Sequence, residues 1–204
     1  MVLSAKGTRL NRRGLETREQ LLKHALYCLA EGGPEAGSAN AVAKRAGVTW
    51  GTIQHQFGDV DGLWAAVLEY TYTHRGRLLD ELPSQPELGP RVEAVVGLMW
   101  TLLETPGALA MYNLRDALPR QWEQLEESFP RTAEVMARWH DDWLAICERS
   151  FAGLDVDERR LARVRDLLPG AIRGIYFERS FARVTDAGEG RQGLIEAITA
   201  YLAS

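Results

Sequence analysis

The sequence predicts an all-α protein, and three of its features support that prediction. Apolar residues recur at helical spacing along almost the whole chain, and no stretch shows the period of two that a half-buried strand requires. The breaks between these stretches contain glycine and proline, which end helices. With 204 residues, of which 46% are hydrophobic and 25% charged, the chain can build one large domain or two small ones. We expect about nine helices.

Four helices are expected in the first part of the chain. The first runs from Glu16 to Glu31 and ends at Gly32-Gly33-Pro34, a strong stop signal. Two short helices follow between Ser38 and Phe57, and a longer one starts near Asp59. This longer helix fades into residues 82–86, which hold two prolines and form the clearest loop between helices.

The second part is expected to hold the remaining helices. Pro90 suits the first turn of a helix that breaks at residues 105–107, and a short helix follows at about residues 108–118. The segment 120–129 also has a helical pattern. The last three helices are expected at residues 130–151, at about residues 157–181 with Pro169 as a kink, and at about residues 189–203.

Charge is distributed unevenly along the chain, whose formal net charge is −4. Residues 1–60 carry three Lys and five Arg against five acids, a net +3, while the rest carries 16 Arg against 23 acids, a net −7. A basic head on an acidic body suits a protein that places one end on a polyanion. Apolar runs are too short to span a membrane, and no secretory signal is apparent, so a cytoplasmic protein is expected.

The two cysteines do not point to a metal site. Cys28 and Cys147 each lie in an apolar helical pattern without the spacing of metal ligands, which predicts two reduced, buried thiols. The run His140-Asp141-Asp142 does not predict a metal site either, because adjacent residues on a helix point in diverging directions. No metal and no cofactor is therefore expected.

The most informative stretch lies between Ser38 and Phe57. Ser38 is a favoured N-cap, and small or apolar residues fall on one face of the helix that it begins. Gly47 tolerates the left-handed backbone that ends this helix and turns the chain. Thr49 can cap a second helix, whose inner side Ile53 and Phe57 anchor. The pattern indicates a helix-turn-helix, although capped helical hairpins with an interposed glycine also occur in other folds.

The outer side of the second helix carries residue types that suit DNA recognition. The residues expected there are Trp50, Gly51, Thr52, Gln54, His55 and Gln56. A glutamine can pair with adenine through two hydrogen bonds, and a threonine can bond a base edge or pack on a thymine methyl group. In a DNA-binding helix-turn-helix, this side of the second helix enters the major groove.

Over about residues 16–70 the sequence resembles the tetracycline-repressor (TetR) family of bacterial regulators. The matching residues are Arg18, Leu21, Leu22, Ala25, Glu31-Gly32, Ser38, Ala46-Gly47-Val48-Thr49, Gly51-Thr52-Ile53, Phe57 and Leu63. The resemblance implies base contacts from Trp50, Gly51, Thr52 and Gln54, and phosphate contacts from Ser38, Thr49, His55 and Gln56. It also implies a dimer joined through the last two helices and a ligand cavity in the central body. The implied domains are a DNA-binding head at residues 1–58 and an effector-binding and dimerisation domain at residues 59–204.

The outer side of the second helix, which is expected to contact DNA, departs from the family pattern. Position 54 is Gln where Tyr is usual, and position 56 is Gln where His or Tyr is usual. Position 60 is Val where Lys is usual. Trp50 occupies a place often held by a small, polar or basic residue. These departures predict either weaker binding to DNA phosphates or phosphate binding by an N-terminal arm. The alternative for the arm is that it is solvated and does not contact DNA. The basic residues of this arm are Lys6, Arg9, Arg12 and Arg13.

The body offers residues for an effector site and for a dimer interface. The candidates for the effector site are Met99, Trp100, Leu103, Met111, Tyr112, Arg115, Trp139, Trp143 and Phe177. Ligand sites are mostly apolar and aromatic, but residues of these types at helical spacing also form an ordinary core. The last two helices carry apolar stripes that suit an interface between subunits, and burial within one chain would explain them as well.

These features predict a ligand-responsive regulator of transcription. Its simplest form is a repressor that binds a palindromic operator as a dimer and is released by a small hydrophobic or aromatic effector. An enzyme is the rival class, but the sequence holds no Glu-x-x-His pair, His-Glu-x-x-His, phosphate-binding glycine loop or Gly-x-Ser-x-Gly elbow. A helical small-molecule-binding protein that has lost DNA binding is the second rival, and the missing Lys at position 60 is consistent with it.

Overall fold

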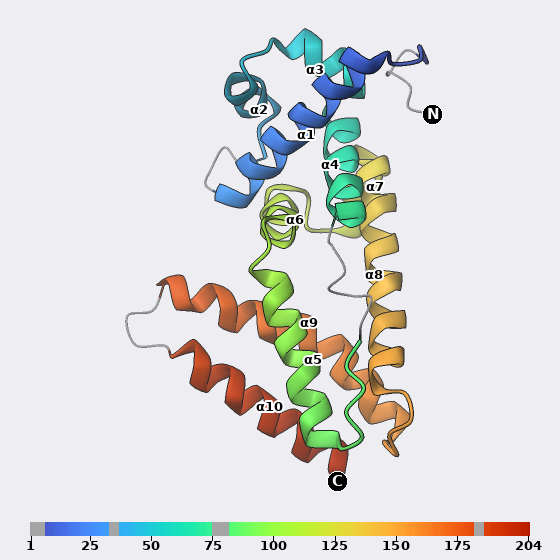
Figure 1. Cartoon of the computed structure of the whole chain (residues 1–204), viewed down its shortest axis with the longest axis vertical. Helices are drawn as coiled ribbons and strands as arrows, with labels where there is room; N and C mark the ends of the chain where they lie inside the picture. Colours follow the sequence, from blue (N-terminus) through green and yellow to red (C-terminus); the bar gives the residue numbers. More distant parts are fainter. Residues whose placement is uncertain (1–6, 33–36, 75–81, 182–185) are drawn as a thin grey trace. The chain divides into compact units, whose positions relative to one another are not determined.

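The computed structural model describes residues 7–32, 37–74, 82–181 and 186–204, and within these ranges it is built of α-helices without a β-strand (Figure 1). The helices are α1 Arg12–Glu31, α2 Ala39–Ala46, α3 Trp50–Phe57, α4 Val60–His74, α5 Leu88–Leu103, α6 Pro106–Ala117, α7 Trp122–Ser128, α8 Pro130–Phe151, α9 Glu158–Phe181 and α10 Ala187–Ala203. The predicted all-α fold is confirmed. The described residues hold one helix more than the expected nine, because the segment between Arg120 and Phe129 forms α7.

The described residues divide into two compact units. The first consists of the residues up to 74 together with residues 105–140, and the second of residues 82–104 and 141–204. The first unit extends beyond the expected boundary at residue 58, because α4 and α6 both pack on α1. The separation into a DNA-binding head and an effector domain at that boundary is a functional division and stays a prediction.

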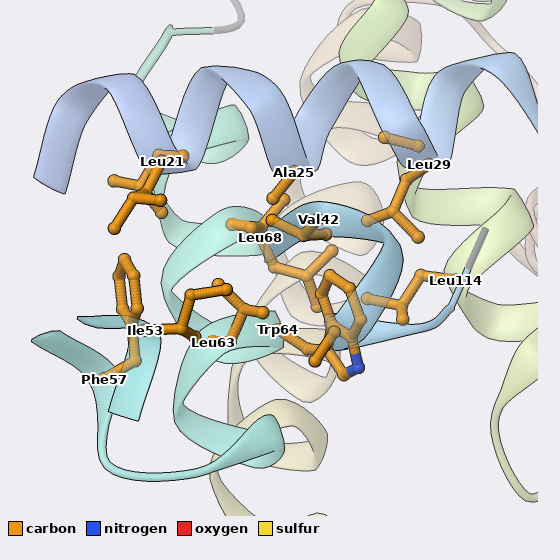
Figure 2. Close-up of a cluster of buried hydrophobic side chains, with 14 of the residues drawn as sticks. Leu21, Ala25, Leu29, Val42, Ile53, Phe57, Leu63, Trp64, Leu68 and Leu114 are labelled. Carbon is orange, nitrogen blue, oxygen red and sulfur yellow. The ribbon is translucent and has the colours of Figure 1, made fainter. Parts of the chain in front are cut away.

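One hydrophobic cluster holds the first unit together (Figure 2). Its labelled members are Leu21, Ala25 and Leu29 of α1, Val42 of α2, Ile53 and Phe57 of α3, Leu63, Trp64 and Leu68 of α4, and Leu114 of α6. The residues from α1 recur every four positions, so they face the cluster as one stripe. Trp64 is 1% exposed and is the largest of the fully buried side chains in the described part of the chain. Helix α3 is thus anchored in the same core as α1 and α4.

Both ends of α1 are closed by specific hydrogen bonds. At its start, the side chain of Asn11 accepts a bond of 2.8 Å from the backbone N–H of Gly14. At its end, Gly32 has a φ of 73°, a conformation that glycine adopts without strain, and the side-chain amide of Asn113 donates to the carbonyl of Leu29 at 2.6 Å. The stop predicted at Gly32 is confirmed.

The second unit is built on α5, which packs on α9 and α10, while α9 and α10 pack on each other. Its buried apolar residues include Val92, Val95, Val96, Met99, Leu103, Ile146, Cys147, Phe151, Val164, Leu168, Ile172, Tyr176, Ile198 and Leu202. Arg91 is also buried, and its guanidinium donates to the carbonyls of Gln85 and Ser150, both at 2.7 Å. These bonds satisfy the charged group, which would otherwise be costly to bury.

Both cysteines are free thiols, as predicted. Cys147 is buried, and this burial raises the pKa of its thiol to about 11. Cys28 is only half-buried, so the expectation of complete burial is wrong for this thiol. In the described part of the chain, no single helix is long and apolar enough to cross a membrane; α5 and α6 meet that criterion only when taken together across the break between them.

Candidate nucleic-acid interface

Helices α2 and α3 form the expected helix-turn-helix. The hydroxyl oxygen of Ser38 accepts a hydrogen bond of 3.4 Å from the backbone N–H of Ala41, so the predicted N-cap of α2 is confirmed. Gly47 ends α2 with φ 65° and ψ 30°, the left-handed conformation that the sequence predicted. The backbone N–H of Val48 bonds to the carbonyl of Ala43 at 3.0 Å, which closes the turn between the helices.

The start of α3 differs in detail from the expectation. Thr49 occupies the N-cap position, but its side chain makes no capping hydrogen bond. Its hydroxyl instead lies 3.4 Å from the hydroxyl of Thr52. The side chain of Thr49 therefore does not cap α3, although the backbone N–H of Thr52 donates to the carbonyl of Thr49 at 3.0 Å. N–H groups at the start of a helix attract anions.

The two faces of α3 are clearly separated. Ile53 and Phe57 are 0% and 4% exposed, which confirms that they anchor the inner side. Gly51, Gln54 and His55 are exposed, and Thr52 is half-buried. Trp50, also expected on the outer side, is only partly exposed because it packs against the hydrophobic cluster of the first unit.

Gln56 does not lie on the outer side of α3, and that expectation is wrong. The residue is 5% exposed, and its side-chain amide donates to the carbonyl of Gly14 at 3.3 Å. The reason is helical spacing, because Gln56 follows Ile53 by three residues and so shares its face. Its amide oxygen is buried and has no hydrogen-bond partner. The burial speaks against the phosphate contact that the resemblance implied.

Arg18 fixes the end of α3 to α1. Its guanidinium donates to the backbone carbonyl of Gln56 at 2.5 Å and lies 4.3 Å from the centre of the Phe57 ring. The group is half-buried, and burial lowers its pKa from the ordinary arginine value. The sequence marked Arg18 only as a residue shared with the family, since nothing in the local pattern reveals a contact across 38 positions.

Residues 21–67 match the family described as bacterial regulatory proteins, tetR family. The N-terminal part of the chain is therefore similar to the DNA-binding region of TetR-family regulators. The HTH-type transcriptional regulator BetI from Yersinia pestis (strain Pestoides F) is 36% identical over 64 residues, which cover 31% of this chain and 32% of BetI. The HTH-type transcriptional regulator Mb3439c from Mycobacterium bovis is 31% identical over 121 residues, which cover 59% of this chain and 57% of that protein. The matches thus span about a third of BetI and little more than half of Mb3439c.

Similarity of fold extends further along the chain than similarity of sequence. The crystal structure of the multidrug binding protein EbrR complexed with imidazole covers 95% of this chain and 96% of its own, with a TM-score of 0.60 and 21% identity. Residues 21–67 thus match the TetR family in sequence, whereas over nearly the whole chain the similarity to EbrR is one of fold. The matched family, BetI and Mb3439c are described as regulators, not as enzymes.

The basic N-terminal arm is only partly described. Lys6 lies outside the described residues. Arg9, Arg12 and Arg13 are exposed, and Arg12 pairs with Glu16 at 3.0 Å one turn further along α1. On α2, Lys44 is exposed, whereas Arg45 makes two hydrogen bonds to Glu31, of 2.5 and 2.8 Å.

The nine candidates for the effector site fall into both units. Met111, Tyr112, Arg115 and Trp139 belong to the first unit, and Met99, Trp100, Leu103, Trp143 and Phe177 to the second. Met111 and Trp139 pack against the core of the first unit, and the indole N–H of Trp139 is buried without a partner. Trp143 donates from its indole to the carbonyl of Arg165 at 3.0 Å. Arg115 is exposed.

Two surface hollows stand out in the described part of the chain, and none of the nine candidates lines either. One, of about 510 Å³, lies at the start of α1. The other, of about 450 Å³, lies between α5 and α10. In the same ranges, no cluster of three or more His, Cys, Asp or Glu side chains is arranged to hold a metal ion. The position of an effector site among the nine residues stays a prediction.

The apolar stripes of α9 and α10 are largely used within the chain. Val164, Leu168 and Ile172 are each at most 1% exposed, and Ile198 and Leu202 are also buried. Burial within the second unit, the simpler alternative for these stripes, therefore accounts for these five. Two large apolar side chains on these helices stay exposed, Leu167 at 57% and Tyr201 at 36%.

Proposed function

We propose that this chain is a cytoplasmic, ligand-responsive transcription repressor that binds a palindromic operator as a homodimer. One observation carries the proposal. The inner residues of α3 are buried in the core of the first unit, while Gly51, Gln54 and His55 are left on the surface. A short helix held rigidly in this way, with polar side chains outside, is what major-groove recognition requires.

Each exposed group of α3 has a role that its chemistry supports. Gln54 can pair with adenine in the major groove, and Gly51 allows the helix backbone to approach the bases. Thr52 and Trp50, half-buried at the start of the helix, would contact base edges beside them. Phosphate contacts would come from His55, the hydroxyls of Ser38 and Thr49, and the N–H groups at the start of α3.

The proposed dimer forms through α9 and α10. The exposed Leu167 of α9 and Tyr201 of α10 support it, since these two helices pack on each other and large apolar side chains on a surface are candidates for a contact site. A symmetric dimer would place two recognition helices about 34–36 Å apart, the separation of successive major grooves. Replacing Leu167 by Asp should shift the sedimentation equilibrium towards the monomer, whereas Ala145→Asp, at an exposed site on α8, should not.

The proposed effector is a small hydrophobic or aromatic molecule bound in the body. The aromatic and apolar candidates support this class of ligand, and so does the similar fold of EbrR, a multidrug binding protein whose crystal structure contains imidazole. Release from DNA would follow if the effector favoured a dimer whose recognition helices no longer match successive grooves. An effector that bound the chain without changing its affinity for DNA would contradict this part of the proposal.

Selection from a random duplex library tests DNA recognition across all operator sequences at once. The protein should enrich a palindromic sequence from 40-base-pair duplexes with randomised centres. Gln54→Ala should weaken binding to the enriched duplex by about tenfold or more, because it removes a base contact. Gln124→Ala, at an exposed site on α7, should leave the affinity unchanged. If no sequence is enriched, the chain is instead a small-molecule-binding protein on the TetR fold, the alternative that Val60 supports.

A further inference from the structure

A buried carboxylate joins the start of α4 to the start of α8. Asp61, in the first turn of α4, is 7% exposed and accepts four hydrogen bonds from two consecutive residues of α8. One oxygen accepts from the backbone N–H of Thr132 at 2.9 Å and from its hydroxyl at 2.8 Å. The other accepts from the backbone N–H of Arg131 at 3.1 Å and from its side-chain Nε at 3.0 Å.

These bonds make Asp61 the N-terminal cap of a helix on which it does not lie. Helix α8 begins at Pro130, which has no N–H, and the first free N–H groups are those of Arg131 and Thr132. Phe129, the residue directly before the helix, has no side-chain oxygen that could cap them. The negative charge of Asp61 also complements the positive end of the α8 dipole.

The same contact reaches the end of the recognition helix. Asp59 accepts a hydrogen bond of 2.8 Å from the backbone N–H of Gly62 and also pairs with the guanidinium of Arg131. A Cβ atom on Gly62 would lie 2.1 Å from the carbonyl oxygen of Phe57, the last residue of α3, and 2.7 Å from Arg131 Nη1. The carbonyl at the end of α3 and the side chain of Arg131 from the start of α8 are therefore both packed closely against Gly62 in the first turn of α4.

We propose that Asp61 is a positioning residue for DNA recognition, through which the start of α8 fixes the recognition helix α3. The inference rests on the proposed function. A displacement of α8 would be transmitted by the hydrogen bonds of Asp61 to the first turn of α4, and from there to the end of α3. The orientation of α3 would then be regulated through this one carboxylate. Trp139 and Trp143, two of the predicted effector residues, lie on α8 about two and three turns beyond this contact. Effector binding at either residue would act on the same helix.

The test replaces Asp61 by Asn, which keeps the size of the side chain but removes its charge and half of its accepting oxygens. We expect the affinity for the duplex enriched from the random library to fall by about 3- to 30-fold. The matched control is Glu69→Gln, which weakens an exposed ion pair with Arg138 between the same two helices. This control should bind the duplex like the wild type.

A second control separates positioning from simple loss of stability. Leu114→Ala removes a fully buried side chain of α6 and destabilises the same unit without touching the start of α8. Affinities are compared at a temperature where circular dichroism shows every variant to be folded. The proposal is refuted if Asp61→Asn binds as tightly as the wild type, or if Leu114→Ala loses as much affinity as Asp61→Asn.

Hydrogen exchange of backbone amides tests, without DNA, whether Asp61 holds α3 in position. Asp61→Asn should speed exchange at the amides of residues 53–58 relative to Glu69→Gln, because α3 loses its fixed support. Unchanged exchange there would overturn the positioning role. If the wild type enriches no duplex, the proposed function fails, and the exchange at residues 53–58 still decides whether Asp61 holds α3.

Discussion

Replacing Gly62 by alanine tests the closest approach between the recognition helix and α4. The added Cβ would lie 2.1 Å from the carbonyl oxygen of Phe57, whereas carbon–oxygen contacts are rarely shorter than about 3.3 Å. The backbone at the end of α3 must therefore move by roughly 1 Å, since a backbone carbonyl cannot rotate away as the side chain of Arg131 can. Overpacking of this kind costs about 1–3 kcal/mol.

A smaller effect opposes this cost. Alanine is favoured over glycine in a helix by roughly 0.5–1 kcal/mol, so we expect the free energy of unfolding to fall by about 1–2 kcal/mol in total. Urea denaturation of the Gly62→Ala variant, at one fixed protein concentration, measures this change from the midpoint and the slope of the transition.

Gly51→Ala is the matched control. Gly51 lies in the first turn of α3 and is exposed, and a Cβ there would come no closer than 3.6 Å to the nearest atom outside the adjoining residues, the hydroxyl of Thr49. This variant should be as stable as the wild type or slightly more stable. If Gly62→Ala proves as stable as Gly51→Ala, the close contact between α3 and α4 is not present in solution, and the reasoning about the support of α3 fails.

Three further predictions concern stability, pH and thiol chemistry. Arg91→Ala should lower the free energy of unfolding by about 1–3 kcal/mol in thermal or urea unfolding, because buried carbonyls lose their donor, while Arg149→Ala, at an exposed site, should have little effect. For Asp61, burial acts to raise the pKa, but the donors at the start of α8 outweigh it and the pKa is lowered. A carboxylate whose pKa is lower in the folded state stabilises the protein above its unfolded pKa of about 4 and loses that contribution as the pH falls through its folded value. Asp61→Asn should therefore lose less stability below about pH 4 than the wild type, and parallel acid limbs of the two stability curves would contradict this. Finally, a thiol-reactive disulfide at pH 8 should modify Cys28 long before Cys147, whose pKa of about 11 and burial suppress the thiolate; equal rates in the folded protein would refute this.

The helix-turn-helix could be predicted from the sequence because local chemistry determines it. An N-cap serine, a glycine suited to the left-handed turn and two apolar residues four positions apart specify the turn without help from distant parts of the chain. Gln56 shows where such reasoning fails. Taking Ile53 and Phe57 alone as the inner side places Gln56 on the outer side, whereas its spacing of three residues from Ile53 favours the inner side, where it lies.

Contacts between distant segments could not be read from the sequence. Asp61 and Thr132 are separated by 71 positions, and neither shows in its local pattern that one caps the helix of the other. The apolar stripes of α9 and α10 pose a related problem, since a stripe buried within the chain and a stripe buried between subunits have the same periodicity. Only the packing of α5 on both helices shows which residues, such as Ile172 and Ile198, are already buried in one chain.

Equilibrium binding across a range of salt concentrations tests most directly whether this protein recognises DNA through α3. The wild-type protein is titrated against the duplex enriched from the library and against a duplex of the same composition in scrambled order. We predict that the enriched duplex is bound more tightly at every salt concentration, and that the logarithm of the binding constant falls linearly as the logarithm of the salt concentration rises. Equal affinity for the two duplexes, or binding that does not respond to salt, would contradict such recognition.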